Sequence, residues 1–384
     1  MAAAPYFSTV TSESAFKARY EAENGKPFAD IISVSASDWG RHHLLACRVV
    51  RRDPQRSVLP LLSQFTQPSD LSSSTEISRF IDGPSANDLT RSEHSLVRDS
   101  TCGISLAQAW SSIAMFKGGQ DGRRRDIVDS TEEENKSDSE ARTKRLRRRT
   151  LLEDYVDTNT IQIGSSSPLA DGSQGTSSIG YIDMESHISF LLPEDETLRL
   201  ASCVIRHILY FAPPQDSSSL STVVEFRDVK SRLAASTPTL ARTIVATDDG
   251  GLCLREESRG FFKVSKDRVA LLEAKRRFQC LENGRPIISD ECFAQMTCEA
   301  LVARIADPLG ELEHGSIIVI NTTQHYMCFL HFEITDTYLQ DFESPLPASF
   351  LYVNSTPWFD LTSRSGREHV VLNLCGIMRW ARMA

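Results

Sequence analysis

A long polar segment interrupts this chain and limits where a folded core can form. From Gly118 to Thr150 the sequence has almost no apolar side chains. Such a segment cannot bury enough surface to offset the loss of chain entropy, so we expect it to be disordered. A second polar stretch, Gly164–Ser178, follows shortly after it. The sequence therefore predicts a partly ordered N-terminal region at 1–117, a largely disordered linker at 118–178 and a folded domain at 179–384.

Composition narrows the class of protein. The chain has 384 residues, 40% of them hydrophobic, and a net charge of −9. An acidic protein of this kind is no general polyanion binder, so any contact with nucleic acid needs a local basic patch. The nine cysteines are scattered singly, without a C-x-x-C pair. We therefore expect buried free thiols and no zinc site.

Patterns that the sequence lacks give expectations for the location of the protein in the cell and for its ligands. The first residues carry no charged segment followed by an apolar core, and no apolar run approaches a membrane span. We expect an intracellular protein, in the nucleus or the cytoplasm, with no membrane partner. No glycine-rich phosphate loop occurs, so we expect no nucleotide cofactor. What the N-terminal region binds, if it has a protein partner, is not indicated by any pattern.

The polar segment contains a basic cluster with three alternative interpretations. It could be a nuclear-import signal, a nucleic-acid contact or a solvated charge run in a linker. The import candidates are Lys144, Arg145, Arg147, Arg148 and Arg149.

The C-terminal region alternates between helical and extended patterns. Apolar spacing predicts a helix at Glu194–Ala212, and Ser289 is a suitable cap for a second helix at Ile288–Ala306. A third helix is expected over Glu368–Met383. Extended patterns occupy 221–229, 240–247, 252–257, 269–275, 316–321 and 325–334. This order predicts an α/β (α+β) fold with a central mixed sheet of four to five strands flanked by helices.

One of these strands ends in an unusual way. In VALLEAKRRF, at Val269–Phe278, an apolar run leads directly into Glu273 and Lys275. Side chains alternate along a strand, so these two point the same way, roughly 6–7 Å apart. The pair is either an exposed ion pair at a strand end or two sides of a site for something small and charged. Taken alone, the triplet favours the ion pair.

Its surroundings favour the site. The run DDGGLCLRE…VALLEAKRRF…RPIISDECFAQ resembles the PD-(D/E)XK nuclease superfamily, whose fold is restriction-endonuclease-like, and within it a group of fungal proteins. The resemblance covers roughly residues 190–345. Two features depart from the superfamily pattern: no proline precedes the aspartate, and Asp248 competes with Asp249 for its role. The 24-residue spacing from Asp249 to Glu273 also implies an elongated hairpin.

The resemblance implies a set of site residues. Asp249, or alternatively Asp248, and Glu273 would hold Mg²⁺ or Mn²⁺, because hard cations prefer carboxylate oxygens. Lys275 would act on the attacking water, and Gln295 would assist from the following helix. A first-helix acid, assigned to Glu196, completes the set, although acids are favoured at any helix start. Two arginines, Arg276 and Arg277, would bind flanking phosphates.

The sequence thus supports more than one function. The first is metal-dependent phosphodiester hydrolysis of nucleic acid. The second is a nuclease-like fold that has lost hydrolysis and serves as a binding module for nucleic acid or protein. A third is a recognition protein whose N-terminal half binds a partner. His325 and His331, near the later strands, are expected to be structural rather than catalytic.

Overall fold

The computed structural model describes most of the chain on both sides of the polar segment. The described residues are 4–31, 35–99, 102–116, 194–282, 285–307 and 315–383. The expected linker at 118–178 and the basic cluster at 144–149 lie outside them, so both remain predictions. Among the described helices, none combines the length and apolar character that crossing a bilayer requires.

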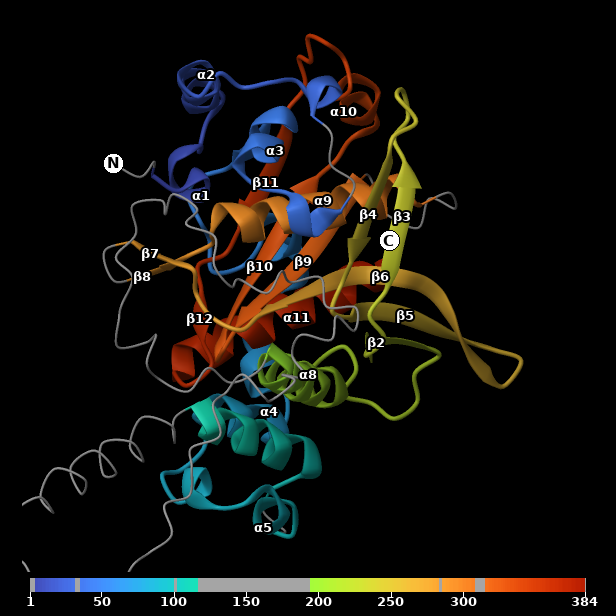
Figure 1. Ribbon diagram of the computed structural model, residues 1–384. Coiled ribbons are helices and arrows are strands. Elements are labelled where there is room, and N and C mark those ends of the chain that lie inside the picture. The colour runs from blue at the N-terminus through green and yellow to red at the C-terminus, as the bar shows by residue number, and fades with distance from the viewer. Residues whose placement is uncertain are drawn as a thin grey trace, which may run out of the picture.

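A mixed sheet of eight strands forms the centre of the molecule (Figure 1). The strand order is β1-β11-β10-β9-β6-β5-β2, and β12 pairs with β10. Among the described strands of this sheet, β1/β11 and β6/β9 are the parallel pairs. The strands are β1 (Val49–Arg51), β2 (Thr222–Arg227), β5 (Gly251–Ser258), β6 (Phe261–Lys275), β9 (Ser316–Thr323), β10 (Tyr326–Glu333), β11 (Leu351–Ser355) and β12 (Phe359–Asp360). A mixed sheet flanked by helices is confirmed, with more strands than the four to five expected.

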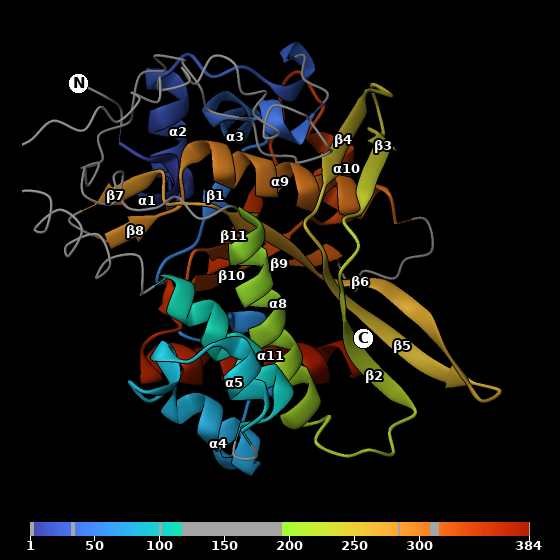
Figure 2. The same cartoon turned by 60° about the horizontal axis from the view of Figure 1, so that its bottom comes forward.

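Helices cover both faces of this sheet (Figures 1 and 2). The face covered by α9 contributes one hydrophobic cluster, and the face covered by α8 and α11 contributes another. The α9 side holds α1 (Tyr6–Thr9), α2 (Glu13–Ala22), α3 (Arg41–Ala46), α9 (Asp290–Ile305) and α10 (Asp336–Asp341). The other side holds α4 (Thr75–Asp82), α5 (Glu93–Val97), a helix at 104–116, α8 (Glu194–Phe211) and α11 (Arg364–Met383).

The two clusters explain why β6 reads as a continuous apolar run. Leu271 belongs to the cluster under α9, whereas Leu272 belongs to the cluster under α8. A strand buried on both faces needs apolar residues at every position, not at alternate ones. Glu273 and Lys275 share the parity of Leu271, so they point toward α9.

The N-terminal residues belong to the same two cores. Strand β1 extends the sheet beside β11, and the Tyr6 hydroxyl donates to the carbonyl of Val49 at 2.7 Å. Trp39 and Phe80 are buried, one in each cluster. Residues 4–116 and 194–383 therefore fold around shared hydrophobic cores. Short 3₁₀ helices link the N-terminal elements: η1 (Phe28–Asp30), η2 (Ala36–Asp38), η3 (Pro60–Phe65), η4 (Pro68–Ser72) and η5 (Asp88–Thr90).

Three hairpins complete the fold. β5 and β6 form the elongated hairpin that the spacing from Asp249 to Glu273 implied, and its tip projects from the body (Figure 2). The strand expected at 240–247 forms β4 (Thr243–Thr247), which pairs with β3 (Arg232–Ser236) outside the central sheet. β7 (Cys280–Glu282) pairs with β8 (Arg285–Ile287). All nine cysteines are free thiols, as expected.

Candidate active site

The DDGG turn between β4 and β5 holds Asp249 against the end of β6. The Asp249 amide donates to the carbonyl of Leu272 at 2.9 Å, and Asp249 Oδ2 accepts from the Ala274 amide at 2.9 Å. Gly250 makes this turn at φ +131°, and a Cβ there would lie 2.6 Å from the carbonyl oxygen of Arg227. Only glycine tolerates both constraints, so the turn sequence itself places Asp249 beside Ala274.

The structure separates the two competing aspartates. Both carboxylate oxygens of Asp248 are taken by the Arg227 guanidinium, at 3.1 and 2.7 Å. Asp248 Oδ1 also accepts from the amides of Ser231 and Gly250. Asp248 therefore fixes the turn, and Asp249 is the aspartate that faces β6.

Glu273, Lys275 and Gln295 form one hydrogen-bonded group. Lys275 Nζ lies 2.5 Å from Glu273 Oε1 and donates to Gln295 Oε1 at 2.8 Å. Gln295 Nε2 in turn donates to Glu273 Oε1 at 2.7 Å. Glu273 is fully buried, so this ion pair lies in a low-dielectric environment where its attraction is strong. Sequence reasoning placed these three side chains together, and the structure brings them together.

A second buried glutamate, Glu299, belongs to the group and was not anticipated. Gln295 Nε2 also donates to Glu299 Oε1 at 2.9 Å. Burial raises the pKa of Glu299 well above its usual value, and burial raises the pKa of Glu273 to about 7 even though Lys275 lowers it. Glu273 Oε2 and Glu299 Oε2 are both buried without a hydrogen-bond partner in the described part of the chain, and burial favours the neutral form of Glu299 by raising its pKa. The i, i+4 spacing of Gln295 and Glu299 on one helix face was the available sequence signal.

A second lysine pairs with Asp249. Lys230 Nζ donates to Asp249 Oδ1 at 2.8 Å, and about a third of its side chain is exposed. Burial opposes the charged form of Lys230, but the ion pair with Asp249 raises its pKa above the usual value. Lys230 therefore stays charged, and a cation already neutralises Asp249.

The first-helix acid that was expected, Glu196, lies 3.8 Å from Arg199 on its own helix, and the structure does not bring it to the group. Burial lowers the pKa of Lys275 and Lys230, and their partners Glu273 and Asp249 raise it. The charge of Glu194, two residues before Glu196, adds a smaller effect in the same direction as these partners. The sequence EDE could not distinguish them, because all three acids suit a helix N-terminus.

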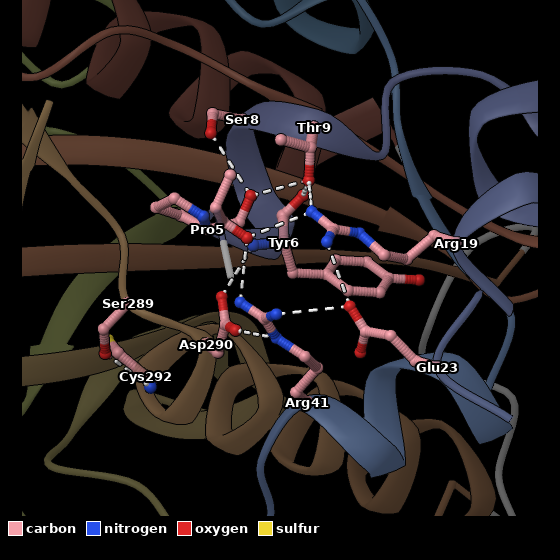
Figure 3. Close-up of polar contacts among 11 residues, drawn as sticks. Pro5, Tyr6, Ser8, Thr9, Arg19, Glu23, Arg41, Ser289, Asp290 and Cys292 are labelled. Atoms are coloured by element: carbon pink, nitrogen blue, oxygen red, sulfur yellow. Dashed lines mark hydrogen bonds and ion pairs between the residues drawn. The ribbon is translucent and has the colours of Figure 1, made fainter. Parts of the chain in front are cut away.

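The N-terminal segment fixes the start of α9 (Figure 3). Ser289 caps the helix as expected, accepting from the Cys292 amide at 3.2 Å. Asp290 Oδ1 accepts from the Tyr6 amide at 2.7 Å, and Asp290 Oδ2 pairs with Arg41. Since α9 also carries Gln295 and Glu299, this anchor sets the position of the site's helix.

Of the remaining expected residues, Arg276, Arg277 and His325 lie near the end of β6, whereas His331 lies toward the other end of β10, opposite Ile318. Arg276 is exposed and Arg277 is half-buried just after β6. His325 is half-buried in the turn before β10, and His331 is buried within it. Burial lowers the pKa of His331 to about 4, so it is neutral at physiological pH and suits the expected structural role.

The site contains the type of ligand atom, carboxylate oxygen, that a hard divalent cation prefers. Asp249 and Glu273 offer carboxylate oxygens, and Lys230 shows that Asp249 accepts a cation. In the described part of the chain, no group of three or more His, Cys, Asp or Glu side chains converges as a metal cage. Mg²⁺ does not require one, because it keeps several waters and is commonly held by one or two carboxylates.

Access to the carboxylates is restricted. Asp249 is 1% exposed and Glu273 is 0% exposed. A groove of about 580 Å³ lies elsewhere, between α8 and the helix at 104–116, and no residue of the site lines it. Its lining side chains are Ile104, Ser105, Gln108, Cys203, Arg206, Tyr210 and Phe211. A ligand at the site must therefore displace Lys230, the most exposed of its side chains.

Comparison with known proteins does not extend this description. No protein-family model matches the sequence, and no curated protein matches it. Membership of the PD-(D/E)XK superfamily accordingly stays a proposal based on the residues and their geometry.

Proposed function

We propose that the chain is a restriction-endonuclease-like protein that hydrolyses phosphodiester bonds in nucleic acid with the help of Mg²⁺ or Mn²⁺. One observation carries the proposal. Asp249, the Glu273–Lys275 pair and Gln295 come from a turn, a strand end and a helix, yet they meet in one buried group. Clusters of ionisable groups with shifted pKa values are typical of functional sites.

Each residue has a role that its contacts support. Asp249 and Glu273 would hold the cation, which when bound supplies charge neutralisation and lowers the pKa of a water molecule. Lys275 stays protonated beside Glu273 and can donate to an oxygen that gains negative charge in the transition state. Gln295 bridges Glu273 and Lys275 and fixes their orientation. Burial raises the pKa of Glu299 and so favours its neutral form, which would limit the negative charge of the buried group.

A second candidate function is supported by the burial of the site. Three of the four carboxylate oxygens of Asp249 and Glu273 accept hydrogen bonds within the protein, and neither side chain is open to solvent. A site held together by its own lysines is what a nuclease-like fold would keep after losing hydrolysis. The chain would then bind nucleic acid or protein without cutting.

Metal titration and cleavage assays distinguish these functions. The wild-type chain should bind Mn²⁺ by calorimetry and cleave DNA or RNA only when the ion is present. Lys275→Ala should lower cleavage by about 100-fold or more and leave Mn²⁺ affinity within about threefold, because lysine carries no ligand oxygen. Asp249→Asn and Glu273→Gln should each lose both Mn²⁺ binding and cleavage. Glu196→Ala is the matched control, since Glu196 lies outside the group, and it should behave like wild type.

Two results separate the proposals. Absence of both Mn²⁺ binding and cleavage in the wild-type chain would rule out hydrolysis and leave the binding module. Cleavage that survives Asp249→Asn would show that the reaction takes place at another site.

A further inference from the structure

We infer that a cluster of aromatic rings beside the site binds the unpaired bases of single-stranded nucleic acid. The cluster, called here the aromatic platform, consists of Phe278, His325, Tyr326 and Trp358, all of them half-buried. The inference rests on the proposed function, because it specifies the substrate class: a nucleic acid whose bases are unpaired next to the phosphate that is cut.

Strand pairing places the platform at the same sheet edge as the site. β6 and β9 are parallel neighbours, and Lys275 lies opposite Thr323 in their register. Phe278 follows Lys275 by three residues, and Tyr326 follows Thr323 by three. Three residues of extended chain span about 10 Å, so both rings lie within that reach of the strand ends. Ligands of such sheets bind at the carboxyl ends of parallel strands.

The third segment of the platform is held there by backbone pairing. Tyr326 lies opposite Asp360 and Met327 opposite Phe359 in the β10/β12 pair. Trp358 immediately precedes β12, and its ring contacts that of Phe278. The platform therefore combines three chain segments next to the ends of paired strands, and its rings are positioned before any ligand arrives.

The rings meet mostly edge to face. The ring centroid of Phe278 lies 5.2 Å from that of Tyr326, with an angle of 68° between the ring planes. The centroids of Phe278 and Trp358 are 5.1 Å apart, and their planes meet at 83°. A T-shaped contact covers at most one face of one ring, so the rings keep faces that no platform ring stacks on. His325 packs on Tyr326 at 4.3 Å and lies 3.7 Å from Asp360, which steadies one end of the platform.

Positive charge lies between the platform and the buried site. Arg276 is exposed and Arg277 half-buried, and both stand in the short stretch that joins Lys275 to Phe278. A single strand needs this combination, because its phosphates are attracted to basic side chains and its bases stack on aromatic rings. The chain as a whole is acidic, so this local pairing of charge and rings is what would attract a polyanion.

The same chemistry excludes an intact duplex from the platform. Bases in a duplex are stacked on their neighbours and present only their edges, so aromatic faces cannot reach them. Unpaired bases are free to stack, and stacking is tolerant of sequence because every base has a flat face. The preferred ligand is therefore a single strand, or a duplex with an unpaired end, without strong sequence preference.

Trp358 offers a specific probe. The chain has four tryptophans, and the other three are buried: Trp39 at 2%, Trp110 at 3% and Trp380 at 6% exposure. Stacking of a base on the platform should quench the fluorescence of Trp358 and leave that of the other three unchanged.

The test uses the full chain in EDTA, so that binding is measured without cleavage. The probes are oligo-dT and oligo-U of about 12 nucleotides, an abasic oligomer of equal length and charge, and a blunt duplex. The two homopolymers show whether DNA or RNA is preferred. Trp358→Ala and Tyr326→Ala should each weaken binding of the preferred homopolymer by about 10-fold, whereas Trp358→Phe, which keeps a ring, should weaken it by less than about threefold. The abasic oligomer should bind wild type about 10-fold less tightly than the homopolymer and quench nothing.

Several outcomes would overturn the inference. One is equal affinity for the abasic oligomer and the homopolymer, and another is wild-type affinity in Trp358→Ala. A third is no binding of any oligomer, which would mean that the rings contact a protein partner or serve only in packing. Cleavage of a blunt duplex with no quenching by single strands would also overturn it and leave the proposed hydrolysis standing. Quenching by single strands in a chain that binds no Mn²⁺ would support the platform and refute hydrolysis.

Discussion

At the scale of single residues, the site is defined by competition for Asp249. One of its oxygens is fixed by the Ala274 amide, and the other is paired with Lys230. The backbone bond is permanent as long as the turn is folded, whereas the lysine is partly exposed and can move. Metal binding, in this account, exchanges one cation for another on the same oxygen.

Replacing Lys230 by methionine should therefore favour the metal. Lys230→Met should bind Mn²⁺ roughly fivefold more tightly, because no ammonium group competes for Asp249. Without metal the variant should be less stable by about 1–3 kcal/mol, since a buried carboxylate loses its partner. Calorimetry and thermal unfolding with and without Mn²⁺ measure both effects. Lys263→Met on the exposed hairpin controls for net charge, and equal Mn²⁺ affinity in the two variants would contradict the exchange.

His207 predicts how stability depends on pH. Its Nε2 donates to the carbonyl of Glu76 at 3.2 Å, and its Nδ1 accepts from the Ser105 hydroxyl at 2.9 Å. Burial lowers the pKa of His207 to about 4. The unfolded chain therefore takes up a proton at a higher pH than the folded chain does, and the stability contributed by neutral His207 is complete above about pH 6.5.

That stability should be lost as the pH falls from about 6.5 toward 4. The loss from this one group is about 3 kcal/mol in the free energy of unfolding. His207→Gln should be less stable at pH 7 but should lose about 3 kcal/mol less than wild type over this interval, as measured by urea unfolding at several pH values. The exposed His42→Gln serves as control and should follow wild type. Parallel curves for wild type and His207→Gln would contradict the assignment.

At the scale of elements, α9 connects the N-terminal segment to the site. Its first turn is tied to Tyr6 and Arg41 through Asp290, and one to two turns later it supplies Gln295 and Glu299. A helix whose outer end is anchored and whose inner face is hydrogen-bonded has little freedom to shift. The N-terminal segment thus supports the site although none of its residues belongs to it.

Removing the anchor should cost both stability and site order. Asp290→Ala should lower the free energy of unfolding by about 1–3 kcal/mol, because it leaves the buried Tyr6 amide without its acceptor and removes one of the partners of Arg41. Glu291→Ala is the control: it sits in the same first turn but is exposed, so it should cost no more than about 0.5 kcal/mol. Chemical unfolding measures the loss of stability in the two variants. Equal losses would mean that the contacts of Asp290 contribute nothing beyond the favourable charge at the helix N-terminus.

Elements and site were predictable to different extents. Helix α9 and strand β6 could be predicted from the sequence, because a serine cap and a long apolar run are local signals. The contact of Asp249 with β6 was predictable only through the glycines of its turn and the resemblance. The contact of Glu299 with Gln295 and the position of Glu196 outside the group were not, since both depend on helix rotation against the sheet. The bounds of strand β1 could not be assigned, because three residues, Val49–Arg51, are too few to show a period.

At the scale of the whole molecule, the chain folds around two cores that both combine residues from before and after the polar segment. Phe80 and Trp110 pack with α8 and α11 residues, and Tyr6 and Trp39 pack with those of α9. A C-terminal portion by itself would expose both apolar surfaces to water.

Two separately encoded pieces should therefore need each other. Residues 194–384 expressed alone should aggregate, whereas co-expression with residues 1–116 should give a complex that co-purifies and unfolds cooperatively. Size-exclusion chromatography and circular dichroism provide the readout. A monomeric, cooperatively folded 194–384 fragment would show that the N-terminal residues are dispensable for the core.

The central claim is that Asp249 and Glu273 bind one divalent cation. A crystal structure of the full chain grown with Mn²⁺, with data collected for anomalous scattering of manganese, tests it most directly. We predict an anomalous peak at about 2.1–2.2 Å from a carboxylate oxygen of each residue, with Lys230 moved out of hydrogen-bonding distance of Asp249. No peak at this position, with Lys230 still paired with Asp249 at millimolar Mn²⁺, would contradict the claim.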